Sequence, residues 1–181
     1  MKMELTVGTD VDQFIKALED FTNATDDMLR WTVYPGAKLT ADKIRKAIED
    51  LPEIKQNPRE TKSSGGAKRP RKSGKSSGKK PKGATKVERE GMLEGLGVAG
   101  MRYDGDFLNA KIGMDGYNKH ITTKWPKGHP NAMVARSIES GTSFRQKCPF
   151  VAPTVRQYKL AAEQEMAKEF DRQVEKHWTY R

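Results

Sequence analysis

Apolar residues recur every three or four positions in the N-terminal part of this 181-residue chain, a spacing that predicts amphipathic helices. The first predicted helix follows an N-cap at Asp10 and carries an apolar stripe formed by Val11, Phe14, Ile15, Leu18, Phe21, Met28 and Leu29. Pro35 and Gly36 are expected to break or bend the chain after this helix. A second helix is expected over residues 40–51, because the same spacing resumes there and Pro52 ends it.

The C-terminal part of the chain contains the longest predicted helix, which starts from an N-cap at Thr154. Along this helix one apolar residue recurs every four positions: Tyr158, Ala162, Met166, Phe170, Val174 and Trp178. Because one helical turn takes about 3.6 residues, a step of four winds the apolar stripe around the helix. A shorter helix is expected over residues 132–139, with Asn131 as its N-cap.

Between these helices, turn residues and short apolar runs are typical of β-strands. Residues 107–112 lie between two turn signals, Asp104-Gly105 and Asp115-Gly116, and are expected to form a strand. Residues 117–125 are expected to form a second strand or a loop, and residues 3–7 a short N-terminal strand. The whole pattern predicts an α+β fold, in which the N-terminal helix and the long C-terminal helix pack on a small, mostly antiparallel sheet.

A hydrophilic segment, residues 55–86, interrupts this pattern and contains no large apolar residue. It carries twelve Lys or Arg and one acidic residue, a net charge of +11, whereas the whole chain carries +10. The remaining residues therefore sum to −1, so a nearly neutral fold carries a basic insertion. Such a segment cannot bury enough surface to offset its ordering entropy, and we expect a disordered loop or linker. Residues 1–54 and 87–181 are expected to form one domain.

The composition is polar for a chain of this length, with 35% hydrophobic and 32% charged residues and a mean hydropathy of −0.84. Typical globular domains contain about 45–50% apolar residues when glycine is counted. Part of the stability is therefore expected to come from neighbours in an assembly. The N-terminus lacks the apolar core of a signal peptide, and no apolar run approaches the roughly 18 residues of a membrane span. We therefore expect no membrane association, and synthesis in a cytoplasm-like compartment.

The residue types that carry most enzyme chemistry are sparse and scattered. The three histidines, His120, His129 and His177, have no metal-ligand spacing with one another or with the single cysteine, Cys148. Cys148 is interpreted as a small packing residue beside Phe150, and a cysteine-dependent hydrolase remains only a nominal alternative. The sequence therefore predicts no catalytic residues, no metal, no cofactor and no small-molecule substrate.

The basic segment suggests contact with nucleic acid or with an acidic protein surface. Eight of its side chains are the candidates for this contact: Lys68, Arg69, Arg71, Lys72, Lys75, Lys79, Lys80 and Lys82. They could neutralise phosphates and release counterions, which would make binding sensitive to salt and independent of the nucleic-acid sequence. No aromatic residue is interleaved, so base stacking is not indicated. A solvated spacer without any partner is an equally open interpretation.

The most specific pattern lies near the C-terminus, where Glu139-Ser-Gly-Thr-Ser is followed by Pro149-Phe-Val-Ala-Pro and then by the charged helix. From the residues alone this block is interpreted as a structural corner. Gly141 would make the turn, Thr142 would form local hydrogen bonds, and Phe150 would anchor the chain between two prolines.

This block resembles the phage tail-component family of lambda-like long-tailed phages and prophages, whose members are called neck, tail-completion or minor tail proteins. The resemblance covers roughly residues 131–178. The matching residues are Glu139, Gly141, Thr142, Ser143, Pro149, Phe150 and Pro153. The family's Pro-x-x-Thr-Gly-x-Leu motif is absent, and the basic segment lies in that part of the chain.

The resemblance implies an α+β subunit that assembles with copies of itself into a ring at the junction between phage head and tail. Such a ring completes the tail or joins it to the head connector, and it has no active site. The partners implied are neighbouring neck, connector or tail proteins, and the location is the virion after synthesis in the bacterial host cytoplasm. The alternative is a nucleic-acid-binding accessory protein that acts through residues 55–86, or a ring whose loop also touches DNA.

Overall fold

The computed structural model describes residues 8–55, 80–105, 107–121 and 125–177, and side chains from residue 14 onward. The predicted strand at residues 3–7 lies outside these ranges. The chain divides into two compact units: the first contains residues 1–40, 98–111 and 158–181, and the second contains residues 41–97 and 112–157. Within the described ranges, no helix combines the length and apolar character needed to cross a lipid bilayer.

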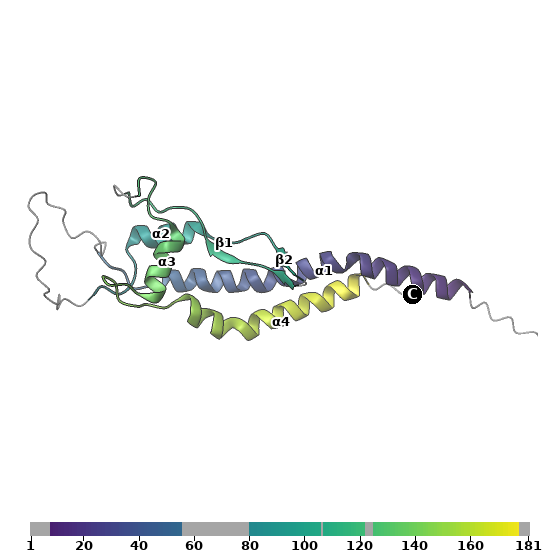
Figure 1. Ribbon diagram of the computed structural model, residues 1–181. Helices are drawn as coiled ribbons and strands as arrows, with labels where there is room; N and C mark the ends of the chain where they lie inside the picture. Colours follow the sequence, from purple (N-terminus) through teal and green to yellow (C-terminus); the bar gives the residue numbers. More distant parts are fainter. Residues whose placement is uncertain (1–7, 56–79, 106, 122–124, 178–181) are drawn as a thin grey trace, which may run out of the picture. The chain divides into compact units, whose positions relative to one another are not determined.

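The described residues form four helices and two two-stranded antiparallel sheets, which confirms the predicted α+β class (Figure 1). The helices are α1 (Gly8–Glu49), α2 (Lys86–Gly95), α3 (Asn131–Ser140) and α4 (Val151–His177). The strands are β1 (Leu96–Val98), β2 (Arg102–Asp104), β3 (Phe107–Asn109) and β4 (Ile112–Met114), and β1 pairs with β4 whereas β2 pairs with β3.

Helix α1 continues through Pro35, so the helix predicted over residues 40–51 is part of α1, and of the predicted break or bend at Pro35 and Gly36 the break is wrong. A proline inside a helix costs roughly 3 kcal/mol because it removes one backbone N–H and crowds the preceding turn. Packing against α4 offsets part of this cost, since Gly36 is buried and a Cβ there would lie 2.6 Å from Cγ of Met166. Close approach of the two helices therefore explains the glycine, and it is a contact that no local pattern could reveal.

The first unit also contains the β2–β3 hairpin. Its register pairs Arg102 with Asn109 and Asp104 with Phe107, and Gly105 in the turn has a φ of +62°. The Asp104-Gly105 turn signal is therefore confirmed. The hairpin contacts α1 through the hydroxyl of Tyr103, which donates to Oδ1 of Asp26 at 2.9 Å. This hydrogen bond to a carboxylate is the main cause that raises the pKa of Tyr103.

The second unit contains a continuous hydrophobic core. Eleven buried residues form it: Ile44, Ile48, Leu51, Ala84, Met92, Leu96, Val134, Ala135, Ile138, Cys148 and Phe150. Helices α2 and α3 pack against each other and against β4. Cys148 is buried in this core with Phe150, as the sequence predicted. The core holds together the segments on both sides of the basic insertion.

Helix α4 begins at Val151, three residues before the predicted cap at Thr154. The predicted winding of its apolar face is visible in the burial pattern. Ala162 is buried and Met166 is half-buried, but Phe170 is exposed and the buried position in the last turns belongs to Gln173. The amide of Gln173 donates to Oε1 of Glu169, which satisfies a polar group on the inner face.

Candidate functional site

The residues that carry the family resemblance lie at one corner of the second unit, between the end of α3 and the first turn of α4. Gly141 follows α3 with a φ of +74°, a conformation that residues with a Cβ rarely adopt. A Cβ at this position would also lie 2.8 Å from the backbone nitrogen of Lys147. The chain therefore requires glycine here for two independent reasons, and the predicted turn at Gly141 is confirmed.

A short loop after Gly141 is closed by Thr142 and Arg145. The backbone N–H of Thr142 donates to the carbonyl of Arg145 at 2.9 Å, and the N–H of Arg145 donates to Oγ1 of Thr142 at 3.2 Å. The N–H of Cys148 then donates to the carbonyl of Ile138 at 2.9 Å, which ties the loop to α3. The local hydrogen bonding predicted for Thr142 is confirmed, whereas Ser143 is exposed at the tip of the loop.

Glu139 caps α4 from the preceding helix. Its carboxylate accepts hydrogen bonds from three successive backbone N–H groups, those of Phe150 at 2.6 Å, Val151 at 2.9 Å and Ala152 at 3.0 Å. Partial burial alone would raise the pKa of Glu139, but these three donors and the charge of Lys147 lower it overall. A negative charge at this end of α4 also interacts favourably with the helix dipole.

The Glu139 cap replaces the predicted N-cap. The hydroxyl of Thr154 donates to the carbonyl of Phe150 at 2.6 Å, so Thr154 lies inside the first turn, and its assignment as the N-cap is wrong. Pro153 has no N–H to satisfy, and the three N–H groups before it all bind Glu139. The three N–H groups at the start of α4 are therefore all satisfied by one carboxylate. The side chains of Pro149 and Pro153 are exposed.

The N-terminus of α3 also differs from its prediction. Asn131 is the first residue of the helix, the N-cap position is Pro130, and no side chain caps it. The side chain of Asn131 is buried and its amide donates to the carbonyl of Asp115 at 2.8 Å. Asn131 therefore joins α3 to the end of β4 rather than capping its own helix. The packing of α3 against β4 places the carbonyl of Asp115 within hydrogen-bond distance of the Asn131 amide.

A buried ion pair joins the corner to α2. Nη2 of Arg145 lies 2.7 and 2.9 Å from the two carboxylate oxygens of Glu88, and both side chains are almost fully buried. Glu88 also accepts from the N–H of Thr85, while Oγ1 of Thr85 accepts from the N–H of Glu88. This is a capping box at the start of α2, so one carboxylate both caps a helix and neutralises a buried arginine.

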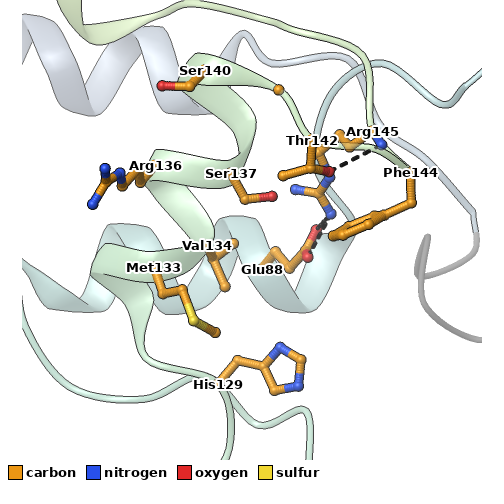
Figure 2. A pocket seen from close by; sticks show the side chains of 11 residues that line it. Glu88, His129, Met133, Val134, Arg136, Ser137, Ser140, Thr142, Phe144 and Arg145 are labelled. Atoms are coloured by element: carbon orange, nitrogen blue, oxygen red, sulfur yellow. Dashed lines mark hydrogen bonds and ion pairs between the residues drawn. The ribbon is translucent and has the colours of Figure 1, made fainter.

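The ion pair forms part of the wall of a pocket of about 410 Å³ (Figure 2). Figure 2 shows His129 and Met133 at one end and Ser140 and Thr142 at the other, with Glu88 and Arg145 beside each other. Ser137, Ser140 and His129 all line this pocket, and His129 lies at the opposite end from Ser140 (Figure 2). Among the described residues, no three His, Cys, Asp or Glu side chains form a possible metal site.

Six of the eight basic candidates, those from Lys68 to Lys79, lie outside the described residues. The other two, Lys80 and Lys82, are exposed and lie beside the corner. Nζ of Lys80 donates to the carbonyl of Thr142 at 3.4 Å, and Lys82 forms a backbone bridge with Gln146. The structure therefore brings the end of the basic segment and the motif block together, which their separation in the sequence did not predict.

The two ends of the basic segment meet in the fold. The N–H of Ile54 donates to the carbonyl of Ala84 at 3.0 Å, and the N–H of Ala84 donates to the carbonyl of Pro52 at 2.9 Å. Ala84 is fully buried and belongs to the core. The chain thus leaves the core and returns to it at the same point, as an insertion does.

No protein-family model matches the chain, and neither a curated protein nor a solved structure is significantly similar to it.

Proposed function

We propose that this protein is a structural subunit of the neck or tail junction of a phage particle. In this proposal it assembles with copies of itself into a ring that completes the tail or joins it to the head connector, without catalysis. The observation that carries the proposal is the corner itself. Glu139, Gly141, Thr142 and Phe150, which carry the resemblance, have the structural roles of cap, turn, loop closure and core anchor.

A second observation supports assembly. Large apolar side chains remain exposed in both units, most of them in the first: Ile15, Leu18, Trp31, Phe107, Ile121, Leu160 and Phe170. Single exposed apolar residues are common on monomers, but Ile15 and Leu18 line one hollow of α1, and grouped apolar surface of this kind is typical of protein contacts. Subunit contacts would bury them and supply the stability that a chain with 35% hydrophobic residues lacks.

The remaining partners in this proposal are neighbouring neck, connector or tail proteins, and the location is the virion. The basic segment would reach an acidic surface next to the ring, on another protein or on DNA in the channel. Because its two ends are joined at Pro52 and Ala84, the segment can make such a contact without disturbing the core.

The proposal is tested by measuring the size of the purified, nucleic-acid-free protein. Light scattering and negative-stain imaging at low and high salt should show rings, or a monomer that becomes a ring when tail or connector proteins are added. A protein that stays monomeric in the presence of these partners, and never copurifies with necks or tails, would contradict the proposal.

A second function, nucleic-acid binding through the insertion, is favoured by the net charge of +11 over residues 55–86. Deletion of residues 62–82 should then abolish DNA binding, and the affinity of the intact protein should fall steeply with salt. The matched control replaces every Lys and Arg of this stretch with Gln or Ser at constant length. Unchanged DNA affinity in both variants across a salt series would eliminate this function.

A further inference from the structure

We propose that the ring contact is formed by the N-terminal part of α1 of one copy, which docks into a groove between α3 and the first turns of α4 of the next copy. This inference rests on the proposed function, since it names the two surfaces that would join neighbouring subunits. We call the first surface the α1 ridge, residues 14–26, and the second the α3–α4 groove, formed by Ala135, Arg136, Val151, Ala152, Val155 and Arg156.

The α3–α4 groove is apolar and flanked by positive charge. It has a volume of about 500 Å³, and Val155 leaves 41% of its surface exposed within it. Arg136 and Arg156 are exposed, and neither forms a hydrogen bond or ion pair with any described residue. The one carboxylate of the groove, Glu139, is occupied by three backbone N–H groups of α4. The groove therefore favours an apolar segment that carries negative charge.

The α1 ridge has the complementary character. Ile15 and Leu18 are 47% and 39% exposed, and with Glu19 and Thr22 they surround a shallow hollow on the helix surface. The hydroxyl of Thr22 already donates to the carbonyl of Leu18 at 2.8 Å, so burial of this face would leave that group satisfied. Glu19 forms no hydrogen bond or ion pair with any described residue, which leaves its charge available to a partner.

Charge favours a second copy of this chain as the occupant of the groove. Over residues 10–27 the sequence contains six acidic residues and one lysine, a net charge of −5. The helix that contains the ridge is thus acidic and apolar, and the groove is basic and apolar. An amphipathic helix that lies in an apolar groove is a recurrent mode of protein recognition, and complementary rim charges guide its association.

The geometry of such a contact agrees with a ring. The ridge belongs to α1 and the groove to α3 and α4, so each contact uses two different surfaces and leaves one of each available. A contact between unlike surfaces propagates from copy to copy, and it produces a ring when the rotation closes. A contact between like surfaces would stop at a dimer.

Charge reversal tests the pairing directly. Glu19→Arg and Arg156→Glu should each raise the protein concentration needed for assembly by at least about tenfold, because like charges then meet across the contact. Combining the two substitutions in one chain, or mixing the two single variants, should restore assembly, since opposite charges meet again. Glu90→Arg and Arg102→Glu, at exposed positions outside both surfaces, are the matched controls and should assemble like the wild type.

A covalent test uses cysteines at the two surfaces, Ile15→Cys and Ala152→Cys in the same chain. The natural Cys148 is buried, so it should not interfere. Oxidation should produce a ladder of linked copies on a denaturing gel, and each single-cysteine variant should give no ladder. Absence of a ladder from the double variant would overturn the inference, as would single charge reversals that leave assembly unchanged.

The outcomes separate this inference from the function on which it rests. Rings that form normally in both charge-reversal variants would retain the proposed function and overturn only the contact. A wild-type chain that stays monomeric with its tail and connector partners would overturn both. Arg156→Glu that blocks joining to tails while self-assembly is unaffected would overturn the contact, and it would assign the groove to another protein of the neck.

Discussion

The corner between α3 and α4 and the N-terminal part of α1 differ in how completely their groups are satisfied within one chain. At the corner, three N–H groups bind Glu139, Gly141 makes the turn, and Phe150 is buried. On α1, by contrast, Ile15, Leu18, Trp31 and Tyr34 remain exposed, although Met28 on the same helix is buried. The hydrogen-bonding and apolar groups of the corner are thus satisfied within one chain, whereas this part of α1 exposes apolar groups that a second chain could cover.

This difference suggests that the two units obtain their stability from different sources. The second unit contains the core and the buried ion pair, so its stability should be largely a property of the monomer. The first unit contains long helices, a short hairpin and much exposed apolar surface, so part of its stability should depend on neighbours. Substitutions in the two regions should therefore act on different measurements.

The largest effect is expected from Phe150→Ala. Removal of a buried phenylalanine leaves a cavity, and it should lower the free energy of unfolding by about 3–5 kcal/mol. Urea denaturation followed by circular dichroism measures this change. Phe107→Ala is the control, because Phe107 is 77% exposed and its removal should change the free energy of unfolding by less than about 0.5 kcal/mol. Equal stabilities of the two variants would contradict the buried anchor.

Arg145→Met should cost about the same, roughly 3–5 kcal/mol, because it leaves the carboxylate of Glu88 buried without its partner. The double variant Glu88→Gln with Arg145→Met should recover part of this loss, since the uncompensated charge is then absent. Thermal unfolding of both variants measures the loss of stability in the single variant and its partial recovery in the double variant. A single variant that melts no earlier than the double variant would show that the ion pair contributes little to the corner.

Glu139→Gln should have a smaller effect, about 1 kcal/mol at neutral pH, because the amide is a weaker cap than the carboxylate. The pKa of Glu139 is lower in the folded protein than its ordinary value, so its contribution to stability is present above the unfolded pKa. That contribution should be lost as the pH falls through the folded pKa. Stability measured against pH should therefore show the wild type and Glu139→Gln converging in acid, and a constant difference at every pH would contradict the cap.

The smallest effect on folding is expected at the α1 ridge. Ile15→Ser should change the unfolding free energy of the monomer by less than about 0.5 kcal/mol, because the side chain is already exposed. The same variant should assemble at a higher protein concentration than the wild type. Unfolding at a dilution that keeps the protein monomeric, together with sizing at high concentration, separates the two effects. A large loss of monomer stability would show that the ridge belongs to the fold of one chain.

Several features could be predicted because they depend on neighbours in the sequence. The helical spacing of apolar residues predicted helix in the regions of α1 and α4, and the turn residues predicted the turns at Gly105 and Gly141. The single strand predicted over residues 107–112 is wrong, because β3 and the start of β4 divide this stretch between two sheets. The capping box of α2 is equally local, since Thr85 and Glu88 have the spacing that identifies such a box from sequence alone. The wrong predictions, a break at Pro35 and a cap at Thr154, also came from local rules.

By itself, then, the sequence determined where this chain forms helices and turns, where it carries a basic insertion, and which residues compose the corner. Only the tertiary structure decided how α1 continues through Pro35, which carboxylate caps α4, and which partner neutralises Arg145. The physical reason is distance along the chain. Glu139 acts 11 to 13 residues away and Glu88 lies 57 residues from Arg145, so these contacts form only when the core brings these segments together.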